Sequence, residues 1–565
     1  MPSVSAHVAL TLAQHIDAVF GVMGNGNAYF LDALEKQTDA VFTAVRHEQG
    51  AVVAADAHFR ASGRIAAATS TYGAGFTNTI TSLAEAVQAH VPLVLVVGDE
   101  PTSGPRPWDV DQIALASAVG ARTYTVGRAD ASATTVIAIE HAITYRVPVV
   151  LAIPYDVAAL DAGPLPAAPA PRIPAPLAPK GEFADGMLDE IATALRDAER
   201  PFLLAGRGAW LAGASDALGA LAEATGALTA SSALGRGIFP ETRYDLGVAG
   251  GFGADGAMSL VREADVAVVF GASLNQFTMR FGELFAPGTR VFQVDIAPTA
   301  THPHVGGFIR ADARLVAEAL VARLGDPGTR SRADAPLAAS APTRDLPAWR
   351  DRVDVPAARA YAPGDDLAPD GRLDPRSAAR RIAELLPEDR VVVSDGGHFI
   401  GWANMYWPIT APDRMMMIGT AFQSIGLGWP SVVGAALARR ESTVVLTSGD
   451  GGGLMAIADL ESAVRAAGGR GMAVVWNDAA YGAEVNLYGI KGLAEGPMRI
   501  PEVDFAAFGA AVGAEGVVVR TLADLDRMES WTREDATSRR FLVLDLRISG
   551  DVVAPYQQEI IRVNS

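Results

Sequence analysis

The sequence contains no cysteine, which excludes disulfide bonds, thiolate metal sites and a cysteine nucleophile. Basic residues are outnumbered, with 46 Lys and Arg against 64 Asp and Glu, and they form no long run, so nucleic acid is not an expected partner. No uncharged apolar stretch reaches about 18 residues, so we expect no membrane-spanning helix. Residues 1–22 also lack the basic start and continuous apolar core of a secretory signal. We therefore expect a cytoplasmic protein.

The sequence does contain enough apolar residues for several hydrophobic cores. Half of its 565 residues are hydrophobic, which is sufficient for two or three domains. Two Pro/Ala-rich stretches, 161–180 and 325–375, are predicted to be linkers. The blocks that they separate lie at about 1–165, 185–325 and 375–565, and each alternates helix-like with strand-like segments. This alternation predicts an α/β fold with three domains, each built on a doubly wound parallel sheet.

Short apolar runs that end at glycine, aspartate, proline or a polar turn predict the strands. The predicted strands are 19–23, 65–69, 92–97, 147–153, 202–205, 227–230, 266–270, 291–294, 391–393, 443–446, 472–476 and 541–546. The first and third blocks have a similar order of segments. We therefore expect the same architecture to occur twice in the chain.

Polar residues follow two of the predicted strands in the third block. A glycine-rich turn, SGDGGG at 448–453, contains Asp450 and precedes a predicted helix at 454–464. Asn477 and Asp478 follow the next strand. Ligands of parallel sheets bind beyond the carboxyl ends of the strands, so these acidic and amide side chains should lie side by side.

This turn suggests a phosphate group held through a cation. Glycines let a phosphate approach the backbone, and a helix N-terminus offers N–H donors. An acidic residue inside such a loop requires a positive ion between it and the phosphate. A hard, oxygen-bound ion such as Mg²⁺ suits Asp450 together with Asn477 or Asp478.

The turn and the polar pair resemble the signature of thiamine diphosphate enzymes. The resemblance implies thiamine diphosphate and Mg²⁺ as cofactors, with Asp450, Asp478 and the Ala480 main-chain carbonyl as metal ligands. This alignment requires one extra residue near 468–471. Asn477 therefore stays open as the alternative side-chain ligand.

A second motif in the first block supports the resemblance. Residues 46–51 read RHEQGA, and Arg60 follows after ADA at 55–57. This pattern is similar to the surroundings of the catalytic glutamate in the acetolactate synthase, pyruvate oxidase and 2-oxo acid decarboxylase superfamily. The resemblance makes Glu48 the residue that hydrogen-bonds the cofactor's pyrimidine in a largely apolar cleft. It also implies that the three blocks are pyrimidine-binding, central and diphosphate-binding domains.

Further residues match cofactor-lining or catalytic positions of this superfamily. The cofactor-binding matches are Gly24, Asn25, Gly73, Gly397, Ile425, Gly449, Gly451, Gly452, Tyr481 and Gly482. Ile425 matches the bulky residue that bends the cofactor. Beside Glu48, the resemblance implies Gln112, His398 and Glu484 as groups that move protons or contact the substrate.

Glu484 bears on the branch of the superfamily. It lies six residues after Asp478, where pyruvate and indolepyruvate decarboxylases carry an acid and acetolactate synthases usually carry an apolar residue. An acid here would serve as a proton donor. However, residues 107–112 lack the histidine pair of the pyruvate decarboxylases. These features name no substrate.

The resemblance implies cleavage or formation of a C–C bond next to a carbonyl. The expected reactions are 2-oxo acid decarboxylation, carboligation to a 2-hydroxy ketone, or both. The alternatives are a thiamine-dependent diketone-cleaving hydrolase, a flavin-dependent 2-oxo acid oxidase and a non-catalytic binding protein. FAD is possible but not favoured, because no G-x-G-x-x-G motif follows the central strands. A homodimer or homotetramer with active sites at the subunit interface is expected.

Overall fold

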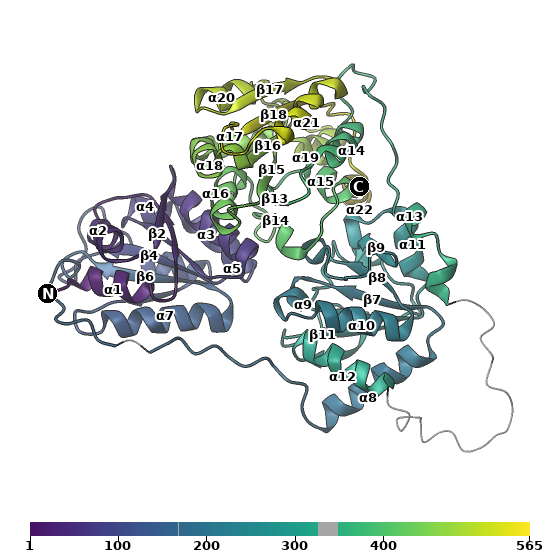
Figure 1. The fold of residues 1–565 in the computed structure, drawn as a ribbon, viewed down its shortest axis with the longest axis horizontal. Helices are drawn as coiled ribbons and strands as arrows, with labels where there is room; N and C mark the ends of the chain where they lie inside the picture. The colour runs from purple at the N-terminus through teal and green to yellow at the C-terminus, as the bar shows by residue number, and fades with distance from the viewer. Residues whose placement is uncertain (168, 326–347, 565) are drawn as a thin grey trace. The chain divides into compact units, whose positions relative to one another are not determined.

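The computed structural model describes residues 1–167, 169–325 and 348–564. It contains three six-stranded parallel sheets, each accompanied by helices (Figure 1), which confirms the predicted α/β architecture. The strand order is β2-β1-β3-β4-β6-β5 in the first sheet and β14-β13-β15-β16-β18-β17 in the third. These orders are the same when each sheet is numbered from its own first strand. The prediction that one architecture occurs twice is therefore confirmed.

The strands of each sheet come from one block of the chain. The first sheet contains β1 (Ala18–Gly21), β2 (Val41–Ala44), β3 (Ala66–Ser70), β4 (Leu93–Asp99), β5 (Arg122–Thr125) and β6 (Pro148–Pro154). The central sheet contains β7 (Pro201–Ala205), β8 (Leu228–Ser231), β9 (Asp245–Val248), β10 (Val266–Phe270), β11 (Arg290–Asp295) and β12 (Val305–Arg310). The third sheet contains β13 (Arg390–Ser394), β14 (Met415–Met417), β15 (Thr443–Gly449), β16 (Gly471–Asn477), β17 (Glu515–Val519) and β18 (Leu542–Arg547).

Helices connect the strands within each block. Those up to the first linker are α1 (Val4–Leu12), α2 (Ala28–Gln37), α3 (Glu48–Ser62), α4 (Ala74–Thr77), α5 (Ile80–Gln88), α6 (Gln112–Ala118) and α7 (Ala131–Tyr145). Those of the central region are α8 (Glu182–Asp197), α9 (Arg207–Leu211), α10 (Ser215–Thr225), α11 (Asp255–Glu263), α12 (Ala313–Gly325) and α13 (Val355–Ala358). The last group is α14 (Pro375–Leu385), α15 (Ile400–Tyr406), α16 (Gly428–Ala438), α17 (Asp450–Met455), α18 (Leu460–Ala467), α19 (Gly482–Tyr488), α20 (Phe505–Ala511), α21 (Asp526–Arg533) and α22 (Pro555–Asn564).

Helices pack on both faces of the first sheet. Val19 points into a core formed with α1, α2 and α7. Successive strand residues point to opposite faces, and the next residue, Phe20, contacts the ring of His58 from α3, with ring centroids 6.0 Å apart. Thus α3, which carries Glu48 at its start, covers the other face.

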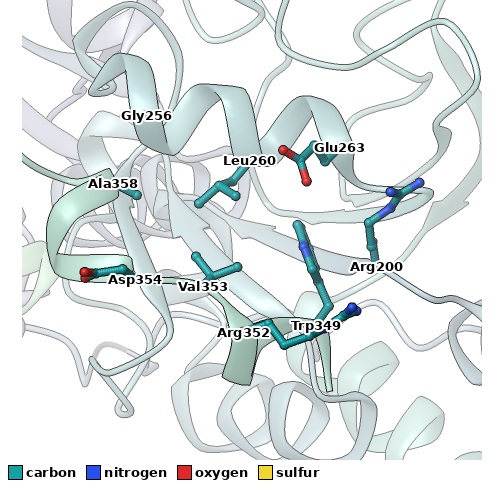
Figure 2. Close-up of a pocket in the computed structure, with 9 residues that line it drawn as sticks. All are labelled: Arg200, Gly256, Leu260, Glu263, Trp349, Arg352, Val353, Asp354 and Ala358. Carbon is teal, nitrogen blue, oxygen red and sulfur yellow. The ribbon is translucent and has the colours of Figure 1, made fainter. Parts of the chain in front are cut away.

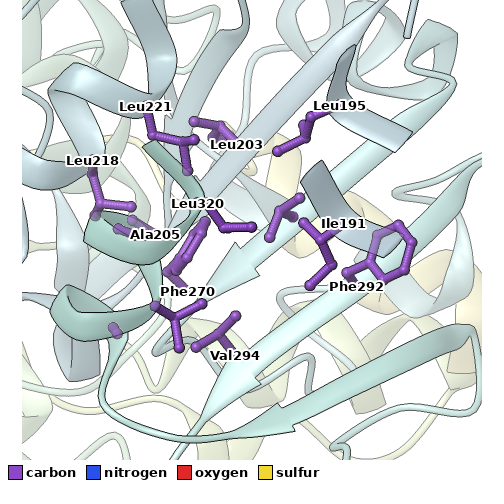
Figure 3. Packing of buried hydrophobic residues seen from close by; sticks show 14 of the residues in the cluster. Ile191, Leu195, Leu203, Ala205, Leu218, Leu221, Phe270, Phe292, Val294 and Leu320 are labelled. Carbon is purple, nitrogen blue, oxygen red and sulfur yellow. The ribbon is translucent and has the colours of Figure 1, made fainter. Parts of the chain in front are cut away.

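The central sheet has an apolar core of its own. Figure 3 shows side chains of α8, α10 and α12 against strands β7, β10 and β11. Ile191, Leu218 and Leu320 are each fully buried there. Burial of such side chains stabilises a fold by about 1.5–3 kcal/mol each relative to exposure.

By contacts, the chain forms two compact units. One contains residues 1–174, 364–403 and 413–554, and the other contains 175–363, 404–412 and 555–565. The first and third sheets therefore belong to the same unit. The boundaries predicted from the sequence for three separate domains stay predictions.

Two local predictions are refined by the structure. The single helix predicted at 454–464 is wrong: α17 ends at Met455, a 3₁₀ turn spans Ile457–Asp459, and α18 starts at Leu460. The break arises because Ala456 leaves helical geometry, with φ −108° and ψ 20°.

In the first predicted linker, no helix or strand forms among the described residues from 162 to 181. In the second, 326–347 lie outside the described residues, whereas Val355–Ala358 is helical.

Candidate functional site

Two acidic residues meet at the carboxyl edge of the third sheet. Asp450 directly follows β15, and Asp478 directly follows β16. These strands run parallel, with Gly449 opposite Trp476, so the residue after each strand lies at the same edge. Both carboxylates are buried. Their place at one edge of the sheet is the one predicted from the sequence.

Each of these carboxylates has an oxygen without a hydrogen-bond partner. Asp450 Oδ1 accepts a hydrogen bond from the N–H of the next residue, Gly451, at 2.8 Å. Asp450 Oδ2 is buried and has no hydrogen-bond partner. Asp478 Oδ2 lies 3.3 Å from Nε2 of His398, whereas Asp478 Oδ1 is unpartnered. Buried polar atoms are normally satisfied, so this pair of oxygens has the character of an ion-binding site.

Burial and mutual repulsion change the acidity of the pair. Burial, followed by the negative charge of Asp478, raises the pKa of Asp450 to about 7. Burial also raises the pKa of Asp478, against the opposing effect of His398. Two buried like charges disfavour each other's ionised form, and a bound cation would remove that penalty.

Asn477, the alternative metal ligand, has a different environment. Its side-chain amide donates to Asp545 Oδ1 at 2.9 Å and to the Val503 carbonyl at 3.0 Å. Its own Oδ1 is buried without a partner. The negative charge of Asp478 acts directly on Asp450, whereas the Asn477 amide is held by Asp545 and Val503, so the arrangement favours Asp478 over Asn477 as the partner of Asp450.

The loop after β16 has an unusual backbone conformation. Ala479 has φ +58°, in the left-handed region that non-glycine residues seldom adopt. Ala480 follows it and forms an isolated bridge with Arg499. Among the described residues, no group of three or more His, Asp or Glu side chains is arranged to hold a metal. A metal at this edge would therefore need a main-chain oxygen such as that of Ala480.

Glycines permit close packing around the two carboxylates. A Cβ at Gly451 would lie 2.6 Å from the Tyr481 ring. A Cβ at Gly482 would overlap the His398 ring and lie 2.9 Å from Asp478 Oδ2. These glycines, predicted from the sequence as cofactor contacts, are therefore required by the packing of the site itself.

The remaining glycines of the site surround two other side chains. Gly397 and Gly449 both face Phe399, at 2.6 Å and 2.8 Å from the position of an added Cβ. An added Cβ at Gly452 would lie 2.7 Å from Asp395 Oδ2. The loops after β13 and β15 consequently approach each other more closely than larger residues would allow.

Asp395 is a site residue that the sequence analysis missed. Its side chain is fully buried, and Oδ1 accepts from the backbone N–H groups of Gly396, Gly426 and Leu427 at 2.8–3.1 Å. Its Oδ2 accepts from Ser448 at 3.3 Å. Asp395 therefore connects the loops that follow β13 and β14 with the end of β15. Its position directly after an apolar strand was the available signal.

Ile425 belongs to one of the loops that Asp395 connects, the Ile425 loop (residues 418–427). It is half-buried, and an added Cβ at Gly396 would lie 3.0 Å from its Cγ2. Gln423, two residues earlier, has φ +58°. This loop thus holds the predicted cofactor-bending residue next to a backbone position of unfavourable conformation.

Glu48 is the first residue of α3 and is half-buried. Its Oε2 accepts from Asn78 Nδ2 at 3.0 Å, and Oε1 lies 3.3 Å from the position of an added Cβ at Gly75. Within the chain, the surroundings of this carboxylate are therefore more polar than the apolar cleft expected from the resemblance. Asn78 was not identified from the sequence.

Gln112 connects the first-block loops. Its Oε1 accepts from the Gly73 N–H at 2.8 Å, and its Nε2 donates to the Gly98 carbonyl at 2.9 Å. The side chain is buried, with a further contact of 3.1 Å to Asp99. Both the oxygen and the nitrogen of the Gln112 amide are therefore hydrogen-bonded within the chain. The geometry favours a role in positioning the Gly73 loop over direct contact with a substrate.

The loop containing Gly24 and Asn25 packs against the loop after β3. Asn25 Nδ2 donates to the Tyr72 hydroxyl at 3.1 Å. An added Cβ at Gly24 would lie 2.7 Å from the Thr71 side chain. The predicted first-block cofactor residues therefore gather at one edge of the sheet, beyond β1 and β3.

Contacts within the larger unit join the start of α3 to the third block. Gln49 Nε2, next to Glu48, donates to the Gly426 carbonyl at 3.4 Å. The backbone N–H of Arg46 donates to Asp459 Oδ1 at 2.7 Å. The start of α3 thus lies beside the Ile425 loop of the same chain. Glu484, by contrast, is exposed on α19.

The central block contains a pocket of about 520 Å³. Figure 2 shows it between α11 and the segment 349–358, with Leu260, Val353 and Trp349 among its lining. No residue predicted from the sequence as catalytic, cofactor-binding or metal-binding lines it. The pocket therefore plays no part in the candidate site.

The glycines after β7 and β10 join two central loops. Gly208 N–H donates to the Gly271 carbonyl at 2.8 Å, and Gly206 N–H donates to the Phe270 carbonyl at 2.9 Å. A Cβ at Gly271 would overlap the Ala209 backbone. Because β7 and β10 are neighbours where the strand order of this sheet reverses, these two loops lie at the position where parallel sheets commonly bind ligands.

Comparison with known families agrees with this fold. Residues 2–119 match the thiamine pyrophosphate enzyme N-terminal TPP binding domain, 188–320 match the central domain, and 395–546 match the C-terminal TPP binding domain. The chain belongs to the thiamine pyrophosphate enzyme family.

Individual relatives have several activities. Acetolactate synthase large subunit of Haemophilus influenzae is 27% identical over 458 residues, covering 80% of this chain and 78% of that protein. Sulfoacetaldehyde acetyltransferase of Roseovarius nubinhibens is 27% identical over 573 residues, covering 98% and 93%. The structure of benzoylformate decarboxylase from Polynucleobacter necessarius aligns with a TM-score of 0.77 at 20% identity, covering 98% of this chain and 99% of that one, and shows the shared fold.

No helix in the parts of the chain that the structure describes is long and apolar enough to cross a membrane.

Proposed function

We propose that this chain uses thiamine diphosphate and Mg²⁺ to break or form a C–C bond next to a carbonyl. The proposed reactions are decarboxylation of a 2-oxo acid, carboligation to a 2-hydroxy ketone, or both. The observation that carries the proposal is the buried pair Asp450 and Asp478, each with an unpartnered oxygen at one sheet edge. Membership of the thiamine pyrophosphate enzyme family supports it.

The donor set fits a hard divalent cation. The side chains of Asp450 and Asp478 and the carbonyl of Ala480 would hold Mg²⁺, which prefers oxygen ligands and usually keeps further positions for water or phosphate. A bound cation would remove the electrostatic repulsion between the buried carboxylates of Asp450 and Asp478. The diphosphate of the cofactor would complete the coordination.

The chain's own groups would act around the cofactor in defined ways. Bound thiamine diphosphate supplies a thiazolium that accepts electron density from the carbon next to the carbonyl. Glu48 would hold a hydrogen bond to the pyrimidine, with Asn78 orienting its carboxylate through the 3.0 Å bond. His398 and Glu484 are the proposed groups that move protons at the substrate.

We propose a homodimer or homotetramer with active sites at a subunit interface. Large apolar side chains are exposed next to the site loops: Met23 (66%) precedes Gly24, and Met455 (59%) ends α17. Phe422 (48%) lies in the Ile425 loop. Exposed apolar groups gathered around one site are typical of a surface that a partner covers.

A flavin is not part of the proposal. No G-x-G-x-x-G motif follows the strands of the central sheet. Purified protein should therefore lack the flavin absorbance near 450 nm, whereas a yellow protein would favour the oxidase alternative.

The metal assignment can be tested through thermal stability with and without thiamine diphosphate and Mg²⁺. Thiamine diphosphate and Mg²⁺ together should raise the thermal midpoint of the wild type. Asp450→Asn and Asp478→Ala should lose most of that increase. Asn477→Ala is the matched control, since it should lose stability through its bonds to Asp545 and Val503 yet keep the response. A lost response in Asn477→Ala with a retained one in Asp478→Ala would exchange the two assignments.

A further inference from the structure

A buried carboxylate of the first block reaches into the Ile425 loop of the third block. Glu85, on α5, is 1% exposed. Its Oε2 accepts from the backbone N–H of Phe422 at 2.7 Å. A carboxylate that accepts a backbone N–H in a buried setting forms one of the stronger classes of hydrogen bond.

Glu85 belongs to a buried charged cluster with Arg60 and Asp56. Arg60 forms a two-pronged contact with Asp56, with Nε–Oδ1 at 2.5 Å and Nη2–Oδ2 at 3.1 Å. Its Nη2 also lies 3.3 Å from Glu85 Oε1, and its Nη1 donates to the Met417 carbonyl at 3.1 Å. The cluster contains two carboxylates and one guanidinium. Its remaining negative charge therefore depends on backbone donors such as Phe422.

The Ile425 loop is held at its middle and at its end by buried carboxylates. Glu85 accepts from the Phe422 N–H in the middle of the loop, and Arg60 binds the Met417 carbonyl directly before it. Asp395 binds the N–H groups of Gly426 and Leu427 at its end. Between these contacts lies Gln423, whose positive φ persists only where its surroundings impose it.

We propose that Glu85, supported by Arg60, is a positioning residue for the cofactor. By fixing Phe422 it sets the conformation of Gln423 and the place of Ile425 beside the cofactor. Docking of the first block and the shape of the cofactor loop are thereby coupled. This inference rests on the proposed thiamine diphosphate site, because Ile425 borders that site.

A role in stability alone would have a different signature. A purely structural Glu85 would affect the thermal midpoint of the protein but not its affinity for the cofactor. A positioning Glu85 must weaken cofactor binding beyond any effect of general destabilisation. The test therefore needs a control variant that destabilises the first block without touching the Ile425 loop.

Ile139 provides that control. It lies on α7 and is fully buried in the core on the opposite face of the first sheet from α3. Replacement by alanine creates a cavity of the kind that lowers stability substantially. Ile139→Ala leaves the hydrogen bonds of Glu85 in place.

The experiment measures the dissociation constant of thiamine diphosphate, by quenching of tryptophan fluorescence in the presence of Mg²⁺, for the full-length chain. Glu85→Ala should weaken binding about tenfold to a hundredfold, as expected for losing a hydrogen bond to a charged group. Glu85→Gln keeps one acceptor oxygen and should show a smaller loss. Ile139→Ala should lower the thermal midpoint and leave the dissociation constant unchanged.

Each outcome decides between the two roles. Equal binding by wild type and both Glu85 variants would overturn the inference, as would an equal loss in Ile139→Ala. If Glu85→Ala does not fold, the near-isosteric Glu85→Gln carries the comparison. Failure of the wild type itself to bind thiamine diphosphate would instead contradict the proposed function, so the two failures are distinguishable.

Discussion

At the scale of single residues, the chemistry of the site follows from burying two like charges without an Arg or Lys partner for either. Asp450 and Asp478 lose hydration, and neither makes an ion pair with Lys or Arg within the described chain. Burial of an uncompensated charge is costly, and a cation is the simplest compensation. The raised pKa of Asp450 reflects the missing compensation.

The sequence revealed some of these residues and concealed others for a physical reason. Asp450 and Asp478 directly follow apolar strands, so their position at a sheet edge could be predicted from local pattern. Asp395 also follows an apolar strand, but its bonds and those of Glu85 are made with backbone groups of distant segments, such as the Phe422 N–H. No local pattern in the sequence marks a contact with a distant backbone group.

Ala479 gives a prediction about backbone strain. At φ +58°, alanine is disfavoured by about 1 kcal/mol, and a β-branched residue by more. Ala479→Gly should therefore keep or slightly raise the thermal midpoint, and Ala479→Val should lower it and weaken the response to Mg²⁺. The comparison by thermal unfolding with and without Mg²⁺ checks this, and equal behaviour of the two variants would contradict it.

Asp245 gives a prediction about pH. Burial raises its pKa to about 6 from 3.8, so the folded protein binds this proton more tightly than the unfolded chain. Its stabilising contribution is complete below pH about 4 and is lost as the pH rises through about 6. Asp245→Asn should therefore gain up to about 3 kcal/mol relative to wild type between these limits.

Thermal or urea unfolding of both proteins at pH 4.5 and pH 7.5 measures this difference. Asparagine can still accept the bond from the Gly247 N–H, which is 2.9 Å in the structure. The advantage of the variant should be larger at the higher pH. An advantage that is the same at both values would show that Asp245 does not titrate between them.

At the scale of elements, the packing of α3 against α16 positions Glu48 beside the Ile425 loop. Gly434 allows the approach, since an added Cβ would overlap the Ala54 carbonyl oxygen and lie 2.9 Å from the His58 nitrogen. Neither backbone group can move without moving α3. The two helices therefore require a glycine at this contact.

Gly434→Ala should consequently separate the two helices. We expect a loss of about 1–3 kcal/mol or more of stability, together with weaker thiamine diphosphate binding. Gly186→Ala is the matched control, because Gly186 lies in α8 with nothing within 4 Å of an added Cβ. Alanine there should stabilise the helix by up to about 1 kcal/mol. Similar thermal midpoints for the two variants would contradict the tight contact.

The predicted strands differ from the observed ones in a systematic way. In every sheet the four inner strands were predicted from apolar runs, and the two edge strands were not: β2, β5, β9, β12, β14 and β17. Inner strands of a parallel sheet are buried on both faces and read as continuous apolar runs. Edge strands such as β2 (VFTA) and β5 (RTYT) are partly exposed, so they lack that pattern.

The helix predicted after the glycine-rich turn illustrates a second limit. Apolar residues from Leu454 to Val464 have helical spacing, but the chain turns at Ala456. Asp459 then bonds both Ser462, at 2.8 Å, and the Arg46 backbone, at 2.7 Å. A tertiary contact with the first block thus overrides the local periodicity, which a single sequence cannot show.

At the scale of the whole molecule, repetition of one strand order in the first and third sheets has a functional consequence. The loops at the carboxyl edges of both sheets carry the predicted cofactor residues. The larger unit contains both sets from one chain, while apolar side chains such as Met23 and Met455 stay exposed beside them. A second subunit would cover those side chains.

Complementation tests whether active sites combine two subunits. Glu48→Gln and Asp450→Asn should each be inactive, but co-expression of both should restore about a quarter of wild-type activity, because half of the dimers are mixed and each mixed dimer has one intact site. No recovery would show that Glu48 serves Asp450 of its own chain. Gel filtration with light scattering should confirm that both variants remain oligomeric.

The most direct measurement of the central claim is release of CO₂ from a panel of 2-oxo acids, with thiamine diphosphate and Mg²⁺ and with or without an acceptor aldehyde. Wild type should release CO₂, and Glu48→Gln should bind the cofactor but release little, because only the group that hydrogen-bonds the pyrimidine has been changed. Product analysis would then separate aldehyde from 2-hydroxy ketone. A wild type that binds thiamine diphosphate tightly yet is inert towards every acid would contradict the account and favour cleavage of a diketone.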